Sequence, residues 1–506
     1  MQKNTIKEIS INSALGIINR LVTIILGLVF RKIFITNLGD SLSGLSSLYT
    51  NLLNFLALAT AGLSLSALQK IFLFNSTGDI EAIRKLERFT EKFYRLVSVF
   101  ILVIGFIFCF FLDKIIYNNS YSKTFLRLVF LIQVFSECIG YLYYSKKLIL
   151  QAYSELFVIS IIEIIANIVF YIIQIFLIIK YKNYLIYIVT VPLKYFLIGF
   201  FEKKECIQLH PWLRGKIKSS FHEMRYIFSD LKNTIIMQIS QFIFLSTDSI
   251  VISKFLGLTA VNKYDNYLII LNSITSVVDE VNSALRSTFG MRIADNDSPD
   301  AQNSFVITST LLSHFIGSFC GLSFFYIVDI FITIWLDESF IINKFVIILM
   351  TANFYISNIS SPLKNIMVIK GLFNSDKKVT LTGAIINIVL SIFFIQYIGL
   401  SGVILGTLIG NFFMFVSRIF YFFYLIGKKF LWIYMRNIVL YLFIFLVQFV
   451  IMNLIFAQIS ISNIILRMLF MIFVCCIIPN VINLIVFHNE TIVLIVLRKI
   501  REKIKK

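Results

Sequence analysis

The chain has 506 residues, of which 58% are hydrophobic and only 14% are charged. Soluble domains contain about 25% charged residues, so this composition excludes a soluble globular protein and indicates an integral membrane protein. The net charge of +19 would also suit a nucleic-acid-binding protein. In a membrane protein, however, Lys and Arg accumulate on cytoplasmic loops, so we expect no nucleic acid partner.

Apolar runs long enough for one membrane-spanning helix recur along the whole sequence. In chain order the predicted spans cover residues 10–35, 45–73, 93–112, 122–143, 156–179, 184–201, 227–253, 264–289, 304–328, 341–368, 379–398, 400–426, 434–457 and 462–488. The sequence therefore predicts an all-α integral membrane protein with about 14 transmembrane helices.

Basic residues are distributed unevenly over the connections between these spans. With a cytoplasmic N-terminus, the cytoplasmic connections hold about 31 of the 46 Lys and Arg, and the outer connections hold about nine. Such an asymmetry is typical of a multi-pass protein whose positive loops face the cytoplasm. It predicts that both termini are cytoplasmic.

The longest inner loop, the basic linker at residues 202–225, divides the first six spans from the next six. We expect an N-terminal six-helix lobe at 1–201, a C-terminal six-helix lobe at 226–427, and helices 13 and 14 with a basic cytoplasmic tail at 428–506. A faint repeat supports two related halves, because IFITNLG at 33–39 and IVISKFLG at 250–257 each precede a Ser-Ala-Leu tripeptide.

The connection at residues 78–95 predicts an amphipathic helix on the cytoplasmic side. Ile80, Ile83 and Leu86 recur at steps of three, which places them on one helical face among charged residues.

Polar residues recur at helical spacing within the apolar spans. The predicted substrate-binding residues are Arg20, Arg31, Asn51, Asn54, Gln241 and Asn358, and the predicted ion-coupling residues are Asp248 and Glu280. Charges facing lipid are costly, so these faces are expected to turn inward toward a wet cavity. The alternatives are polar contacts between helices for Ser, Thr and Asn and, for Asp248, a structural ion pair with Arg20 or Arg31.

Other site types find no support in the sequence. The six Cys show no C-x-x-C pair and the four His no metal-ligand spacing, so neither a disulfide framework nor a metal site is expected. No phosphate-binding loop with Gly, Lys and Ser/Thr is visible, so we expect no direct use of ATP. A proton or Na⁺ gradient acting on a buried carboxylate is the expected substitute, with no cofactor.

Four segments resemble a known family. These are RKIFITNLGDSLSGLSSLYTNLLNFLALATAGLSLSAL at 31–68, YSKKLILQA at 144–152, LSTDSIVISKFLGLTAVNKYDNYLII at 245–270 and GLSGVILGTLIGN at 399–411. In this order they are similar to the signatures of the oligosaccharide (Wzx-like) flippases for polysaccharide biosynthesis, in the multidrug/oligosaccharidyl-lipid/polysaccharide (MOP) exporter superfamily. The similarity covers about residues 1–430, and Asp265 departs from the family's usual small or uncharged residue.

The resemblance implies two pseudo-symmetric six-helix lobes around a MATE-like V-shaped cavity, with two further C-terminal helices. It implies a transporter rather than an enzyme, located in the bacterial plasma (inner) membrane. The expected cargo is an undecaprenyl-pyrophosphate-linked oligosaccharide, flipped from the inner to the outer leaflet for cell-surface polysaccharide assembly. The expected partners are this lipid-linked oligosaccharide, membrane lipids and other polysaccharide-assembly proteins.

Two other functions fit part of the sequence. A MATE-like drug antiporter has the same architecture, but the two Arg on the first span favour an anionic cargo. A membrane-embedded glycan polymerase or ligase would need a long outer loop, whereas the longest outer segment is about residues 329–340.

Overall fold

The computed structural model describes residues 2–116, 121–153, 155–215, 246–295, 298–370, 372–427, 429–458 and 461–490. Within these ranges the regular structure is entirely helical, and eleven helices are long and apolar enough to cross a membrane. The prediction of an all-α membrane protein is confirmed. The chain divides into two compact units, residues 1–262 and 263–506, which are described separately.

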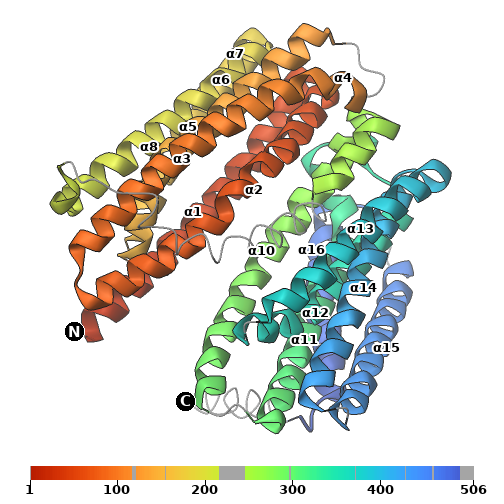
Figure 1. Cartoon of the computed structure of the whole chain (residues 1–506). Coiled ribbons are helices and arrows are strands. Elements are labelled where there is room, and N and C mark those ends of the chain that lie inside the picture. The colour runs from red at the N-terminus through yellow and green to blue at the C-terminus, as the bar shows by residue number, and fades with distance from the viewer. Residues whose placement is uncertain are drawn as a thin grey trace. The chain divides into compact units, whose positions relative to one another are not determined.

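The first unit contains six long helices and several short ones (Figure 1). They are α1 (Gln2–Leu38), α2 (Asp40–Thr77), α3 (Ile80–Phe108), η1 (Cys109–Phe111), α4 (Leu112–Ile115), α5 (Lys123–Ala152), α6 (Leu156–Tyr181), α7 (Tyr184–Ile188), α8 (Thr190–Leu209) and η2 (Pro211–Leu213). α1 packs along α6, and α5 packs against both α3 and α8. Residues 246–256 add a further helical segment.

The helix predicted at residues 78–95 forms the first part of α3. Gly78 adopts a left-handed conformation (φ 73°) that ends α2, and the Asp79 side chain accepts a hydrogen bond from the Ala82 amide that caps α3. α3 then continues without a break to Phe108. Its first turns bury Ile83 and Leu86 against the unit, whereas Ile80 is exposed, so the predicted face is only partly correct.

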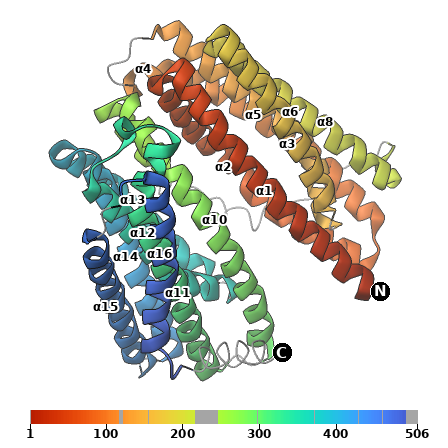
Figure 2. The ribbon, with the colours of Figure 1, turned by 180° about the vertical axis from the view of Figure 1, so that it is seen from behind.

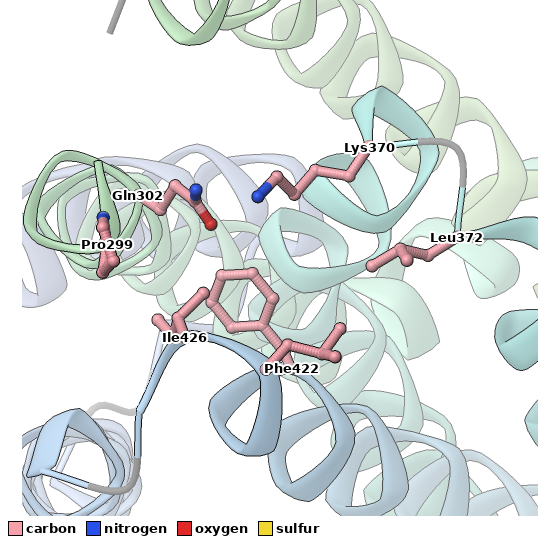
Figure 3. Close-up of a pocket in the computed structure, with 7 residues that line it drawn as sticks. Pro299, Gln302, Lys370, Leu372, Phe422 and Ile426 are labelled. Carbon is pink, nitrogen blue, oxygen red and sulfur yellow. The ribbon is translucent and has the colours of Figure 1, made fainter. Parts of the chain in front are cut away.

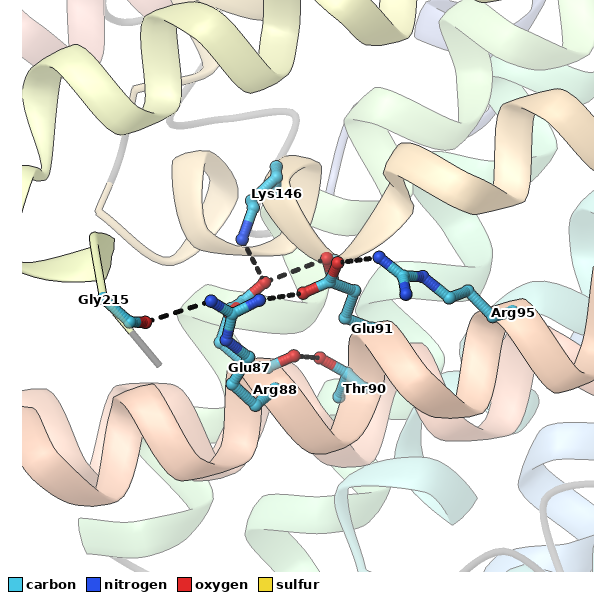
Figure 4. A network of polar contacts seen from close by, with 8 residues as sticks. Glu87, Arg88, Thr90, Glu91, Arg95, Lys146 and Gly215 are labelled. Carbon is cyan, nitrogen blue, oxygen red and sulfur yellow. Dashed lines mark hydrogen bonds and ion pairs between the residues drawn. The ribbon is translucent and has the colours of Figure 1, made fainter. Parts of the chain in front are cut away.

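A buried ion pair joins α3 to α5 near the start of α3 (Figure 4). Lys146 Nζ lies 2.5 Å from Glu87 Oε1, and the Ser145 hydroxyl donates to the same oxygen at 3.1 Å. One turn along α3, Glu91 accepts from both Arg88 and Arg95. Together these contacts compensate carboxylates that would be costly to bury alone.

The second unit contains the remaining long helices (Figures 1 and 2). They are α10 (Leu258–Asp295), which begins in the first unit, α11 (Pro299–Trp335), the short η3 (Glu338–Phe340), α12 (Lys344–Ile369), α13 (Phe373–Ile398), α14 (Leu400–Ile426), α15 (Lys429–Ala457) and α16 (Ile464–Val486). α13 packs against α14, and α11 packs against both α12 and α16.

A buried polar network fastens α15 and α16 to this unit. His314 on α11 is fully buried, and its Nδ1 and Nε2 lie 2.7 Å from Tyr355 Oη and 3.1 Å from Asn483 Oδ1. Gln448 on α15 donates to the same Asn483 oxygen, and the Asn483 amide donates to Ser318 Oγ. Four helices therefore meet in one chain of hydrogen bonds, which is favourable where no water is available.

Candidate functional site

The guanidinium of Arg31 on α1 is the centre of a polar cluster in the first unit. The side chain is half-buried. Its Nη2 donates to Asn262 Oδ1 at 3.0 Å, and its Nη1 lies 3.4 Å from Ser47 Oγ on α2. Contacts from two different helices therefore hold the planar guanidinium in one orientation.

Asn51 extends this cluster by one turn of α2 beyond Ser47. Its amide donates to Ser249 Oγ at 2.9 Å, so α2 is tied to the helical segment 246–256. Asp248 is the residue before Ser249 and is only 5% exposed. We call the group formed by these contacts the arginine cluster; its members are Arg31, Ser47, Asn51, Ser249 and Asn262.

A glycine at the start of α2 allows this cluster to form. A Cβ at Gly44 would lie 2.0 Å from the carbonyl oxygen of Leu258 and 3.3 Å from the backbone nitrogen of Asn262. Only a residue without a side chain permits that backbone approach. Asn262 is thereby brought to α2 and within reach of Arg31 on α1.

The turns that lead into α2 and α10 are also alike. Gly39 (φ 91°) and Gly257 (φ 85°) both have positive φ and directly precede these helices. They end the two repeated segments found in the sequence, IFITNLG and IVISKFLG. The repeat therefore corresponds to a repeated backbone conformation that glycine adopts without strain.

The arginine cluster offers hydrogen-bond donors for an anion, and Asp248 offers a buried carboxylate. A guanidinium presents donors in a fork that matches phosphate oxygens. Asp248 and the hydroxyls next to it offer oxygen atoms, which are the ligands of hard cations, and a carboxylate can also carry a proton. Among the described residues, no group of three His, Cys, Asp or Glu is placed to hold a metal ion.

Two other predicted residues, Arg20 on α1 and Asn54 on α2, are exposed. Part of the predicted polar face of α1 packs on α6, because Asn167 donates to Thr23 Oγ1 at 3.1 Å. Helix–helix contacts thus account for this part of the stripe, in line with the alternative stated for it. Gln241 lies outside the described residues.

Two predicted residues belong to the second unit. Glu280 is exposed on α10. Asn358 on α12 is 6% exposed and packs toward α11, where a Cβ at Gly317 would lie 3.3 Å from the Asn358 Cβ. Their roles in ion coupling and substrate binding stay predictions.

Sequence reasoning did not single out Asn262 as a functional residue. The repeat contains a signal that would have found it. When the two segments are aligned on Gly39 and Gly257, Asn262 falls opposite Gly44, and these two positions meet in the structure.

Comparison with known proteins identifies the fold. No family model and no curated protein sequence matches the chain. Among solved structures, it is similar to the lipid II flippase MurJ in an inward closed conformation, with 15% identity, a TM-score of 0.70, and 94% of this chain and 99% of that chain covered.

Two other transporters of the MOP superfamily are also similar. An inward-facing multidrug resistance MATE family transporter has 15% identity and a TM-score of 0.58, with 83% of this chain and 97% of that chain covered. A MOP superfamily transporter from Pyrococcus furiosus has 12% identity and a TM-score of 0.55, with 85% and 93% covered. The chain therefore has the fold of MOP superfamily transporters, as the resemblance implied.

Proposed function

We propose that this protein flips an undecaprenyl-pyrophosphate-linked oligosaccharide from the inner to the outer leaflet of the bacterial plasma membrane. The observation that carries the proposal is the arginine cluster, in which Arg31 is held by Ser47 and Asn262 within a strongly apolar chain. A half-buried guanidinium in a membrane protein is costly and is expected to serve a function.

The similar structures support a lipid-linked cargo over a free one. The MurJ structure, by its title a lipid II flippase, covers 94% of this chain, whereas the multidrug MATE structure covers 83%. A pyrophosphate attached to a lipid requires cationic donors along the transport path. Arg31 and Arg20 would supply them from one helix, roughly 16 Å apart for 11 residues of α-helix.

In this proposal the arginine cluster, Asn54 and Asp248 have separate tasks. Arg31 binds the pyrophosphate through donors oriented by Asn262, and Asn51 and Asn54 bind sugar hydroxyls. Asp248 exchanges a proton or Na⁺ and so couples transport to an ion gradient. Both termini are cytoplasmic, and other polysaccharide-assembly proteins receive the flipped repeat unit.

A second candidate function is a MATE-like antiporter of small cationic molecules. Its support is the similarity to MATE structures together with the buried carboxylate of Asp248. Such a cargo would be repelled by Arg31, so the same residue distinguishes the two functions.

The test is transport in proteoliposomes by Arg31 variants. The cargo is a fluorescent undecaprenyl-pyrophosphate oligosaccharide, and its arrival in the other leaflet is followed with a membrane-impermeant quencher. Arg31→Ala should lower the rate at least about tenfold, because a charge-assisted hydrogen bond contributes roughly 1.5–3 kcal/mol. Arg31→Lys should restore part of the rate, since it keeps the charge without the fork.

Lys32→Ala is the matched control, because Lys32 is the next residue of α1 and is exposed. It removes the same charge and should transport the cargo at the parental rate. Two results together would instead support the antiporter. The unsubstituted protein would not flip the lipid-linked oligosaccharide, and Arg31→Ala would transport cationic dyes faster than the unsubstituted protein does.

A further inference from the structure

The second unit contains a half-open pocket near the ends of three of its helices (Figure 3). Its volume is about 380 Å³, within the range of small-molecule sites. The lining includes Pro299 and Gln302 at the start of α11, Lys370 and Leu372 after α12, and Phe422 and Ile426 near the end of α14. None of these residues belongs to the arginine cluster.

One side of the pocket is polar and positive. Figure 3 shows the Lys370 ammonium and the Gln302 amide directed toward each other across the opening. Gln302 is only 2% exposed, so its amide is fixed inside the unit. α11 begins at Pro299, which adds the positive end of a helix dipole to the same side.

The opposite side is apolar and is held in place by buried contacts. Phe422 is fully buried. One turn earlier on α14, Arg418 donates from Nε to Asp376 Oδ1 of α13 at 2.7 Å, and both side chains are almost completely buried. The adjacent Tyr421 is hydrogen-bonded to Ser375. The wall is therefore preformed, which lowers the cost of binding.

The pocket lies at the end of an apolar span, where lipid headgroups are expected. α14 ends at Ile426, where one apolar span also ends, and α15 begins at Lys429. Close to Ile426 in the sequence, Tyr424 is 74% exposed and Trp432 is 81% exposed. Exposed Tyr and Trp at the ends of spans are typical of the membrane–water interface.

We propose that this pocket binds the phosphate of an anionic phospholipid. Lys370 and Gln302 contact the phosphate oxygens, and Leu425 and Ile426, which also line the pocket, contact the glycerol backbone and the first carbons of the chains. A soluble anion would gain nothing from the apolar wall. The segment from 364 to 378 carries four Lys, Lys364, Lys370, Lys377 and Lys378, and the potential of an anionic leaflet favours such a segment.

The experiment measures binding of short-chain phosphatidylglycerol to the purified full-length protein by native mass spectrometry. Lys370→Glu should weaken the single tightest lipid adduct at least about tenfold, since a charge-assisted contact becomes a repulsion. Lys378→Glu is the control, because Lys378 is exposed on the same segment and does not line the pocket. It should leave the adduct unchanged.

Lys370→Gln provides a second, milder variant should the charge reversal lower the yield of folded protein; it should weaken the adduct severalfold. Competition separates the two sources of phosphate. Inorganic phosphate at millimolar concentration should not displace the lipid, and displacement would show a soluble-anion site and overturn the proposal. Equal losses in Lys370→Glu and Lys378→Glu, or no loss in Lys370→Glu and Lys370→Gln, would overturn it as well. None of these results depends on what the protein transports.

Discussion

The ion pair between Glu87 and Lys146 allows a quantitative test of the packing of the first unit. We consider the change Lys146→Met, which keeps a side chain of similar length and removes the charge. The Glu87 and Lys146 side chains are only 1% and 7% exposed. After the change, the Glu87 carboxylate keeps the Ser145 hydroxyl as a partner but loses the charge that compensates its burial.

Breaking a buried pair from one side typically costs about 3–5 kcal/mol, because an uncompensated charge stays behind. We expect Lys146→Met to fall in this range. Glu87→Gln should cost less, because a Gln side-chain oxygen still accepts a hydrogen bond from Lys146. The double variant Glu87→Gln/Lys146→Met should be close to the parent, because replacement of both partners is often neutral.

In the assay, unfolding of the purified protein in one detergent is monitored by light scattering and by circular dichroism. A double-mutant cycle isolates the interaction between the two side chains. Glu81 and Lys85 supply a matched control on the same helix. Their ion pair has a similar distance of 2.8 Å but is 68% and 37% exposed, respectively, so Lys85→Met should cost less than about 1 kcal/mol. Equal costs for Lys146→Met and Lys85→Met would refute the reasoning.

Two further predictions concern the backbone contact at Gly44 and the carboxylate of Asp248. Gly44→Ala should destabilise the protein by roughly 1–3 kcal/mol or more, because the added Cβ would overlap the Leu258 backbone. The destabilisation is detected as a lower yield of monodisperse protein. Gly16→Ala is the control and should leave the yield unchanged, because nothing lies within 4 Å of a Cβ at that position. Asp248→Asn should abolish the dependence of flipping on an imposed proton or Na⁺ gradient in proteoliposomes. Asp279→Asn, at an exposed site on α10, should keep that dependence. A gradient-dependent rate per folded molecule equal to the parent's would leave Asp248 with a structural role only.

The helices were predictable because apolar runs and their interruptions are local features of the sequence. The burial of the first turns of α3 was not predictable, because their amphipathic pattern is also that of a surface helix. Ile83 and Leu86 pack against residues that the fold brings to them from other helices. Helical periodicity cannot tell whether an apolar face meets lipid, another helix or water.

The arginine cluster was predictable only in part, for a similar reason. Spacing on one helix selected Arg31 and Asn51 as inward-facing residues. Their partners Asn262 and Ser249 lie 231 and 198 residues away in the sequence, and such contacts depend on how helices pack. The close approach of the Leu258 backbone to Gly44 makes this packing possible. A single glycine in an apolar chain does not predict such an approach.

The hydrogen-bonded network of His314, Gln448 and Asn483 has a consequence for biogenesis. α15 and α16 leave the ribosome after α11 and α12, and each is long and apolar enough to enter the bilayer as an independent span. Within lipid, apolar surfaces gain little from meeting each other, so helix recognition depends on close packing and polar contacts. Asn483 offers one side of α16 to partners already inserted on α11, which selects the face and depth at which α16 docks. Docking of α15 and α16 onto this unit would then be guided by buried amides and an imidazole, after these two helices have inserted.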